Sequence, residues 1–410
     1  MASECAPQPA EPSAVAVATA ADATTDSEPL LPPPPPDAPG SAREPLPKKI
    51  ARTLLHALDR TSNGTHVATT TLNLRVTLAP LPPNQTTTTT DNDHMRIAFL
   101  SDIHYNGAHG GPATSGGTFA CAPGALVQSA VDAVNAAAAD AVVLGGDLVD
   151  GDGTRYAREL VSRYLSQLRA RCGVWAVLGN HDQFVPGSRA ALVHALQGAG
   201  IAVLDNAAVQ PRPWLELVGV GDITTPGDFR PADAFSCRAG TLPPSSPLCS
   251  VRVPPCCKDV CSPHTAVGGI APGGSLLPHC RVVVTHNPDA APHLMNYPAH
   301  IQLSGHTHGG QVCMPTAARR PLAAWLYEDC GWCCCGATRS RVWPIYRSFS
   351  HWEWANGLHT LTPCGLSSEN ARFLYVTRGI GSHTPGRLFC PPEVVVVNIE
   401  AVRETDTSVR

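Results

Sequence analysis

Five short apolar segments recur through the middle of this chain and constrain its fold more than any other feature. Each has the length and composition of a buried β-strand, and they lie at residues 97–100, 141–144, 174–178, 282–285 and 301–303. Three further segments carry apolar residues at helical spacing, at residues 124–139, 155–171 and 188–199. Strands that alternate with helices in this way predict an α/β fold.

Each predicted strand is followed directly by residues that can bind a metal ion. In α/β sheets, ligands bind outside the carboxyl ends of the strands. A single Asp or His after a strand is usually a turn residue, but five such loops in order predict a shared metal site. The candidate ligands are Asp102 and His104 in SDIH, Asp147 in GGDLVD, Asn180 beside His181 in GNHD, His286 in THNPD, and His306 and His308 in SGHTHGG.

The residue types indicate which ions such a site would hold. Carboxylate and imidazole ligands without thiolates suit Mn, Fe or Zn, and they leave positions open for water and substrate. A carboxylate can bridge two ions, and His306 and His308 would point to the same side of an extended segment. Two divalent ions ~3.5–4 Å apart can clamp a phosphoryl group and lower the pKa of a shared water to supply hydroxide. The natural substrate of this arrangement is a phosphate ester.

The motifs DxH, GDxxD, GNHD, a lone His after a strand, and GHTHGGQ resemble those of the calcineurin-like metallophosphoesterase superfamily. The resemblance implies a four-layer α/β/β/α sandwich, in which two mixed β-sheets are flanked by helices. It also implies the distribution of ligands between two divalent ions. The first ion would be held by Asp102, His104, Asp147 and His308, and the second by Asp147, Asn180, His286 and His306, with Asp147 as the bridge.

The same resemblance implies roles for the two residues that follow Asn180. His181 would lie beside the metals and protonate the leaving group or stabilise the phosphoryl transition state, and Asp182 would orient it. His181 and Asp182 are therefore the expected catalytic residues, and the expected reaction is metal-dependent hydrolysis of a phosphodiester or pyrophosphate bond.

The flanking segments HNPD, SGHTHGGQV, LYVTRGIGS and RLFCPPEV are similar to those of a bacterial group of phosphodiesterases, the YkuE/YaeI type. Members of that group act on phosphodiesters or on lipid-linked pyrophosphates, which implies a small-molecule or lipid-linked phosphoester substrate. Many of them carry a membrane anchor or an export signal. The sequence shows neither a secretory signal nor an apolar stretch of the ~20 residues that a membrane-spanning helix needs. We therefore expect a cytoplasmic protein that can contact a membrane peripherally.

Composition divides the chain into two parts. Residues 1–48 are rich in Pro, Ala, Ser and Thr, and few of them could contribute to a core, so they predict a disordered tail. Residues 49–410 would form the phosphoesterase domain, with loop-like, cysteine-rich insertions at about 225–279 and 317–367. The insertions hold two dense groups of the chain's 16 cysteines, namely Cys256, Cys257 and Cys261, and Cys330, Cys333, Cys334 and Cys335. Neither group has regular paired CxxC spacing, so structural zinc and free thiols both remain open.

Two alternatives compete with a phosphodiesterase. One is a phosphomonoesterase, including a protein phosphatase, although phosphoprotein phosphatases carry an Arg after the second motif and a Glu at the end of the third, where this chain has GDLVDGD and GNHD. The other is a non-catalytic scaffold that retains the fold, which loss of a ligand or of His181 would have favoured. The net charge is only −4 and the basic residues are scattered, so no nucleic-acid partner is expected.

Overall fold

A computed structural model describes residues 67–78, 93–107, 124–150, 152–236, 279–313, 321, 349–361, 372–382 and 386–403. All of these residues belong to the unit Lys49–Arg410. The predicted tail at residues 1–48 and both dense cysteine groups lie outside the described residues. Within the described part, no helix is both long and apolar enough to cross a membrane.

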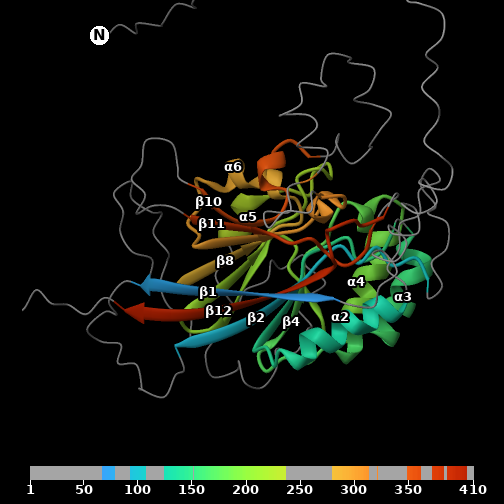
Figure 1. The fold of residues 1–410 in the computed structure, drawn as a ribbon, viewed down its shortest axis with the longest axis horizontal. Helices are drawn as coiled ribbons and strands as arrows, with labels where there is room; N and C mark the ends of the chain where they lie inside the picture. Colours follow the sequence, from blue (N-terminus) through green and yellow to red (C-terminus); the bar gives the residue numbers. More distant parts are fainter. Residues whose placement is uncertain are drawn as a thin grey trace, which may run out of the picture. The chain divides into compact units, whose positions relative to one another are not determined.

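The first sheet is mixed and has six strands. Its two longest strands are parallel neighbours, the next pair is antiparallel, and the remaining pairs are parallel. In spatial order the strands are β1 (Ala68–Leu78), β12 (Glu393–Arg403), β2 (His94–Leu100), β3 (Ala141–Leu144), β4 (Gly173–Ala176) and β5 (Ala202–Val203). Strands from the two ends of the described chain therefore lie side by side (Figure 1).

The second sheet also has six strands and is antiparallel only at its two edges. Its inner strands pair in parallel, so their carboxyl ends share one edge of the sheet. In spatial order the strands are β10 (Gly357–Leu361), β11 (Arg372–Val376), β9 (Ile301–Ser304), β8 (Cys280–Val284), β7 (Leu215–Gly219) and β6 (Ala207–Arg212).

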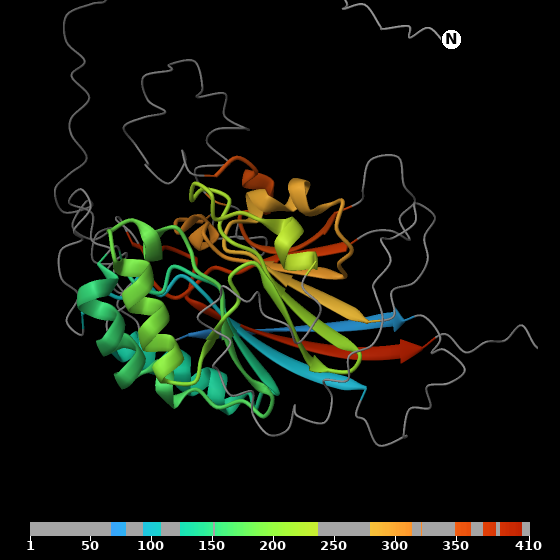
Figure 2. The ribbon, with the colours of Figure 1, turned by 180° about the vertical axis from the view of Figure 1, so that it is seen from behind.

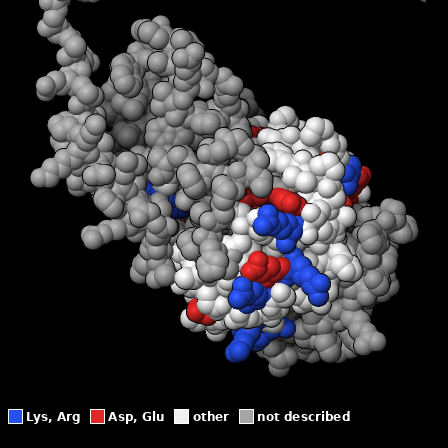
Figure 3. Space-filling model, turned by 90° about the vertical axis from the view of Figure 1, so that its right-hand side faces the viewer, with Lys and Arg blue, Asp and Glu red and all other residues white. Residues whose placement is uncertain are grey.

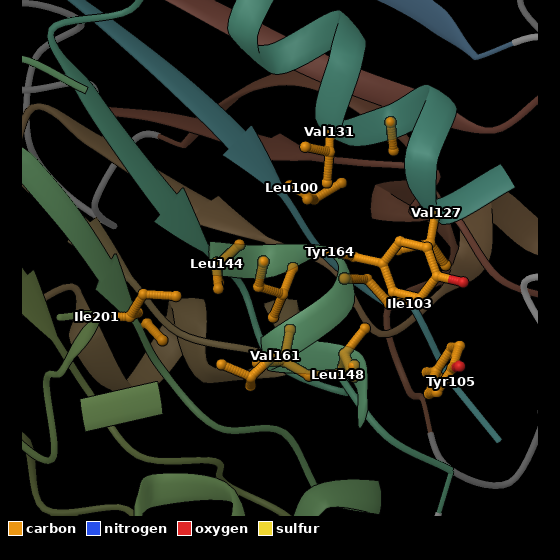
Figure 4. Packing of buried hydrophobic residues seen from close by; sticks show 14 of the residues in the cluster. Leu100, Ile103, Tyr105, Val127, Val131, Leu144, Leu148, Val161, Tyr164 and Ile201 are labelled. Carbon is orange, nitrogen blue, oxygen red and sulfur yellow. The ribbon is translucent and has the colours of Figure 1, made fainter. Parts of the chain in front are cut away.

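Three helices cover the outer face of the first sheet: α2 (Gly124–Ala136), α3 (Gly153–Arg163) and α4 (Ser188–Gly198). Their apolar residues pack on alternate residues of β2 and β3, because successive strand side chains point to opposite faces. Figure 4 shows this core, with Val127 and Val131 of α2 and Val161 of α3 near Leu100 and Leu144.

The other faces of the strands form the remaining layers. Phe99 and Val143 of the first sheet join Leu217, Val282 and Leu303 of the second sheet in one buried cluster between the sheets. On the far side of the second sheet, α5 (Pro231–Ser236) and α6 (Ala291–Leu294) cover a smaller core. Figures 1 and 2 show the two sheets enclosed by these helices from opposite sides. The predicted four-layer α/β/β/α sandwich is confirmed.

The five predicted strands correspond to β2, β3, β4, β8 and β9, but one helix prediction is too long. The helix expected over residues 155–171 ends at Arg163 and is followed by a short 3-10 turn, η1 (Leu165–Gln167). Tyr164 has φ −125° and ψ −60°, outside the helical region, while Leu165 is buried in the core. The apolar spacing beyond Arg163 therefore reflects a buried turn and not a longer helix.

In their described parts, the ranges expected to be loop-like contain a helix, a strand and the short 3-10 turn η9 (Trp352–Trp354). Helix α5 lies in the first range and begins at Pro231, a residue suited to the first turn of a helix. Strand β10 lies in the second range and pairs antiparallel with β11 at the edge of the second sheet. The loop-like description is therefore wrong for these segments. Edge strands that are only partly buried lack the continuous apolar run of inner strands, which is why β10 left no recognisable pattern.

Basic and acidic side chains are intermixed on the described part of one face (Figure 3). Surface ion pairs include Arg163 with Glu159 at 2.7 Å and Arg230 with Asp233 at 3.1 Å. Exposed pairs of this kind contribute ~0–1 kcal/mol each, because water and salt screen them. The fold therefore depends on its three apolar layers more than on its surface charges.

Candidate metal centre

The loops after β2, β3 and β9 bend sharply at the predicted ligands. Among the described residues, nine other than glycine have positive φ, and five of them are candidate ligands: Asp102 (55°), His104 (49°), Asp147 (49°), His306 (70°) and His308 (51°). Such backbone conformations cost ~1–3 kcal/mol each and persist where the surrounding structure holds them, commonly at functional sites. The strain turns these side chains inward at the carboxyl ends of the strands.

Two glycines allow these loops to approach one another. A Cβ atom at Gly179 would lie 2.2 Å from Oδ1 of Asp147, and one at Gly305 would lie 2.2 Å from Oδ2 of Asp102. No side chain fits at such distances, since they are far below van der Waals contact. Glycine in GNHD and in SGHTHGG is therefore required by the packing of one ligand loop on another.

Six of the predicted ligands form two buried groups, in each of which the ligand atoms lie within 4.8 Å of one another. The two groups are Asp102, His104 and His308, and Asp147, His286 and His306. A third group contains His104 from the first group, Asp147 from the second group, and His181. It therefore connects the first two groups. The structure thus brings together residues from all five predicted loops.

The first group is centred on two imidazole nitrogens. Nε2 of His308 lies 2.9 Å from Nε2 of His104 and 3.7 Å from Oδ1 of Asp102. In the second group, Nε2 of His286 lies 3.0 Å from Oδ2 of Asp147 and 3.2 Å from Nδ1 of His306. That oxygen of Asp147 is also 3.5 Å from Nε2 of His104, which connects the groups.

These separations fit ligands that share a divalent ion. Two atoms that are each ~2.1 Å from one ion lie ~3.0 Å apart at a right angle and ~3.4 Å apart at a tetrahedral angle. Two buried oxygens, Oδ2 of Asp102 and Oδ1 of Asn180, accept no hydrogen bond from the described residues. An unpaired buried polar atom is costly, and a cation would satisfy both atoms. The donor set therefore fits divalent metal ions.

Backbone contacts fix the orientation of the candidate ligands. Oδ1 of Asp102 accepts the N–H of His306 at 2.8 Å, and Oδ1 of Asp147 accepts the N–H of His181 at 2.8 Å. Nδ1 of His286 lies 2.9 Å from the carbonyl oxygen of Gly145 and donates to it, so Nε2 faces Asp147. Such outer contacts hold metal ligands in place and set the imidazole tautomer.

The electrostatics of the cluster favour cations. Burial would raise the pKa of Asp147, but the facing imidazoles of His286, His181 and His104 hold that pKa well below its usual range. Burial would lower the pKa of His286, but the charge of Asp147 outweighs it and raises that pKa well above its usual value. The buried carboxylate of Asp147 is therefore ionised and attracts positive charge.

His181 lies beside the two groups and is more accessible than they are. Its side chain is 18% exposed, and Nδ1 lies 3.1 Å from Oδ1 of Asp150. Asp150 is buried, and its Oδ1 is also 3.9 Å from Nδ1 of His104. The contact with His181 and His104 lowers the pKa of Asp150 despite its burial. One carboxylate therefore holds both imidazoles.

The expected orienting role of Asp182 needs correction, because the structure gives that contact to Asp150. Oδ1 of Asp182 accepts the N–H groups of Leu148 and Val149 at 2.8 and 3.0 Å, and Oδ2 accepts that of Gly179 at 2.9 Å. Burial and the neighbouring Asp147 raise the pKa of Asp182 to about 6. Asp182 fastens the GNHD loop to the GGDLVD loop and in this way supports the site.

Asp150 is a residue of the candidate site whose contact with His181 the motifs alone did not reveal. It is the last residue of GGDLVD, three positions after Asp147. The motif therefore includes it, but the sequence alone assigned it no role. Arg387 is a further buried contributor: its guanidinium donates to the carbonyl oxygens of Gly381 and His308 at 2.9 and 3.2 Å. The carbonyl of Gly381 also lies 3.2 Å from Nδ1 of His308. Arg387 thus fixes the loop that holds His308.

Comparisons with known proteins agree with this site. The calcineurin-like phosphoesterase family matches residues 95–310, a segment that carries all five motifs. The chain is 27% identical over 309 residues to phosphodiesterase YaeI of Escherichia coli, covering 74% of this chain and 82% of YaeI. It is 21% identical over 357 residues to UDP-2,3-diacylglucosamine pyrophosphatase LpxG of Chlamydia trachomatis, covering 74% and 83%. It is 25% identical over 281 residues to metallophosphoesterase YkuE of Bacillus subtilis, covering 67% and 73%. Because the matched segment spans more than half of the chain, this protein belongs to the calcineurin-like phosphoesterase family and is a hydrolase of phosphoester bonds.

Proposed function

We propose that the protein hydrolyses a phosphodiester or pyrophosphate bond at a centre of two divalent metal ions. The observation that carries this proposal is the pair of buried ligand groups that meet at Asp147. A single ion would need only one such group. Two groups joined by one carboxylate have the composition that a two-metal site requires.

The ligands divide between the two ions as the family motifs imply. Asp102, His104 and His308 would hold one ion and His286, His306 and Asn180 the other, with Asp147 shared. Carboxylate, imidazole and amide ligands suit Mn, Fe or Zn. When bound, such a pair of ions supplies Lewis acidity toward the phosphoryl oxygens and activates water for attack.

The chain's own contribution to bond cleavage comes from His181. Its imidazole is the part of the cluster that solvent reaches, so its Nε2 can donate a proton to a departing oxygen. Asp150 holds the opposite nitrogen at 3.1 Å and fixes the direction of the ring. The N–H of His181 donates to Asp147, which positions the residue relative to the ligands.

Two further features support a diester or pyrophosphate substrate. YaeI is named a phosphodiesterase and LpxG a pyrophosphatase of a nucleotide-linked lipid, and both resemble this chain over most of its length. Phe184 is 56% exposed, and its ring centroid lies 4.6 Å from that of His181. An exposed ring beside the proton donor offers a surface for an apolar or planar group on the substrate, as a small diester or a lipid-linked pyrophosphate would present.

A three-substrate assay tests the proposal. The purified protein with added Mn is compared on bis-4-nitrophenyl phosphate, 4-nitrophenyl phosphate and a nucleoside diphosphate-sugar. We expect metal-dependent turnover of the diester or of the pyrophosphate, with a smaller rate on the monoester. Faster turnover of the monoester would replace the proposal with a phosphomonoesterase. Absence of turnover on all three, with both metal equivalents bound, would favour a non-catalytic role.

A further inference from the structure

Two free thiols lie close together beside the candidate metal centre. Cys313 and Cys390 are 3% and 1% exposed, and neither is part of a disulfide. Both sulfurs contact the carbonyl oxygen of Gly309, which places the two side chains near each other. Cys313 follows the loop that carries His306 and His308, whereas Cys390 precedes β12, so the contact joins distant parts of the chain.

Backbone hydrogen bonds hold the two segments in this position. The N–H of Leu388 donates to the carbonyl of Gln311, and the N–H of Cys313 donates to the carbonyl of Leu388, both at 2.9 Å. Val312 and Leu388 form a parallel β-bridge. Disulfides form only between cysteines whose backbones are already close, because the S–S bond tolerates little variation in geometry. The bridge between Val312 and Leu388 brings the segments that carry Cys313 and Cys390 together.

Both thiols also point at the same peptide group. Sγ of Cys313 lies 3.2 Å from the carbonyl oxygen of Gly309, and Sγ of Cys390 lies 3.6 Å from that oxygen and 3.4 Å from the carbonyl oxygen of His308. The thiols therefore serve as hydrogen-bond donors to the backbone of the loop that holds His308.

The surroundings of this pair differ from those of the other described cysteines. Nη1 of Arg387 lies 3.8 Å from Sγ of Cys390, so this pair has a polar neighbour. Cys172 and Cys280 lie instead in the apolar core between the sheets.

We propose that Cys313 and Cys390 are a redox modification site, at which hydrogen peroxide joins them in a disulfide. The sulfur of Cys390 attacks one oxygen of the peroxide and breaks the O–O bond, which gives a sulfenic acid and one water. The sulfur of Cys313 then attacks that sulfur and expels a second water. Two S–H bonds are replaced by one S–S bond, and the two electrons pass to the peroxide. Thiol reductants reverse the reaction.

Oxidation changes the support of His308. Closing the disulfide removes both S–H donors, so the carbonyls of Gly309 and His308 lose the sulfur contacts that now hold them. Arg387 binds the carbonyl oxygens of both His308 and Cys390, at 3.2 and 3.4 Å, and transmits any shift of one to the other. The expected result is weaker metal binding, and this consequence, unlike the disulfide itself, rests on the proposed role of His308 as a ligand.

The disulfide is tested on the full-length protein by peptide mapping. The reduced protein is treated with hydrogen peroxide, its remaining thiols are alkylated, and the digest is searched for a peptide pair joined through Cys313 and Cys390. We expect this pair to appear early in the reaction and to disappear on treatment with dithiothreitol. Recovery of both cysteines as separately alkylated peptides, after other thiols have been oxidised, would overturn the proposal.

The effect on the metal centre is measured by titration with Mn before and after peroxide treatment. We expect a ~10- to 100-fold loss of affinity, the usual effect of losing an outer contact of a metal ligand. Cys390→Ser lacks the sulfur that the peroxide oxidises first and should have the same affinity before and after peroxide, while the matched control Cys172→Ser should lose affinity as the unmodified protein does. Equal losses in Cys390→Ser and in the unmodified protein would attribute the effect to other oxidised groups and refute the link. Detection of the peptide pair joined through Cys313 and Cys390, without any loss of Mn affinity, would support the disulfide but refute its effect on metal binding.

Discussion

Replacing Asp150 by asparagine tests how the site orients its proton donor. Asp150 is buried, lies 3.1 Å from Nδ1 of His181, and also faces Nδ1 of His104. Asparagine keeps the size of the side chain but removes its charge, and its amide can present a donor where the imidazole needs an acceptor. The change therefore affects one group beside the metals and one candidate ligand at the same time.

The magnitude follows from the two contacts. A hydrogen bond to a charged group contributes ~1.5–3 kcal/mol, which corresponds to ~10- to 100-fold in kcat if the contact holds His181 in its reactive orientation. The contact with His104 is longer, at 3.9 Å, and belongs to the type of carboxylate–imidazole contact that supports metal ligands. Its loss should weaken metal binding by ~10- to 100-fold. Asp150→Asn should thus lower kcat even when Mn is saturating.

The assay separates the two effects. Turnover of an alkyl phosphodiester is measured across a range of Mn concentrations, and Mn affinity is measured by calorimetry. The control is Asp152→Asn, two residues further on, because Asp152 stands at the N-cap position of α3 without a side-chain capping hydrogen bond, and asparagine is equally favourable at that position. If kcat of Asp150→Asn at saturating Mn equals that of the control, the orienting role of Asp150 is refuted. If only the affinity falls, Asp150 supports His104 alone.

Three further outcomes are expected. Asp147→Asn should reduce the metal content of both sites, measured by elemental analysis, and abolish activity, because one carboxylate serves two cations; full occupancy with normal turnover would contradict the bridging role. His181→Ala should retain both metals and lose ~10²–10⁴-fold in turnover of an alkyl ester, with a smaller loss on a nitrophenyl ester whose leaving group hardly needs a proton; equal losses would point to electrostatic stabilisation instead. Glu216→Gln should lower the free energy of unfolding by ~3–5 kcal/mol, because it leaves the buried guanidinium of Arg281 without its counter-ion; an unchanged denaturation midpoint would show that Arg281 is satisfied by other partners.

The sequence predicted the ligand loops because the rule involved is topological. Residues that follow parallel strands gather at one edge of their sheet whatever their exact conformation, so the order of strands and loops along the chain is enough to group Asp102 with Asp147 on the first sheet and His286 with His306 on the second. The parallel pairing of β8 with β9, and of β2 with β3, brings this about.

The direction of individual side chains was harder to predict from the sequence. Asp150 and Asp182 lie in neighbouring loops, and either could have faced His181. The choice depends on turns in which Asp147 takes a positive φ and Asn180 a helical one. Those angles are set by contacts between loops, such as the close approach of Gly179 to Asp147, and not by local preference. Such contacts between loops cannot be predicted from a sequence pattern.

The outer elements were missed for a different reason. Strand β1 alternates buried and exposed residues only over its second half, and its partner β12 lies more than 300 residues away in the sequence. Pairing over such a separation leaves no local signal. The end of α3 was misplaced because buried apolar residues continue through the turn that follows it.

The position of β12 has a consequence for biosynthesis. This strand lies between β1 and β2, so these two strands cannot be joined in the first sheet until residues 393–403 have been translated. Until then β1 has no partner, and β2 presents an unpaired edge that can associate with other chains. Pairings of such long sequence separation also form slowly. A nascent chain therefore exposes the unpaired β1 and the open edge of β2 until β12 has been translated, a state in which association with other chains competes with folding.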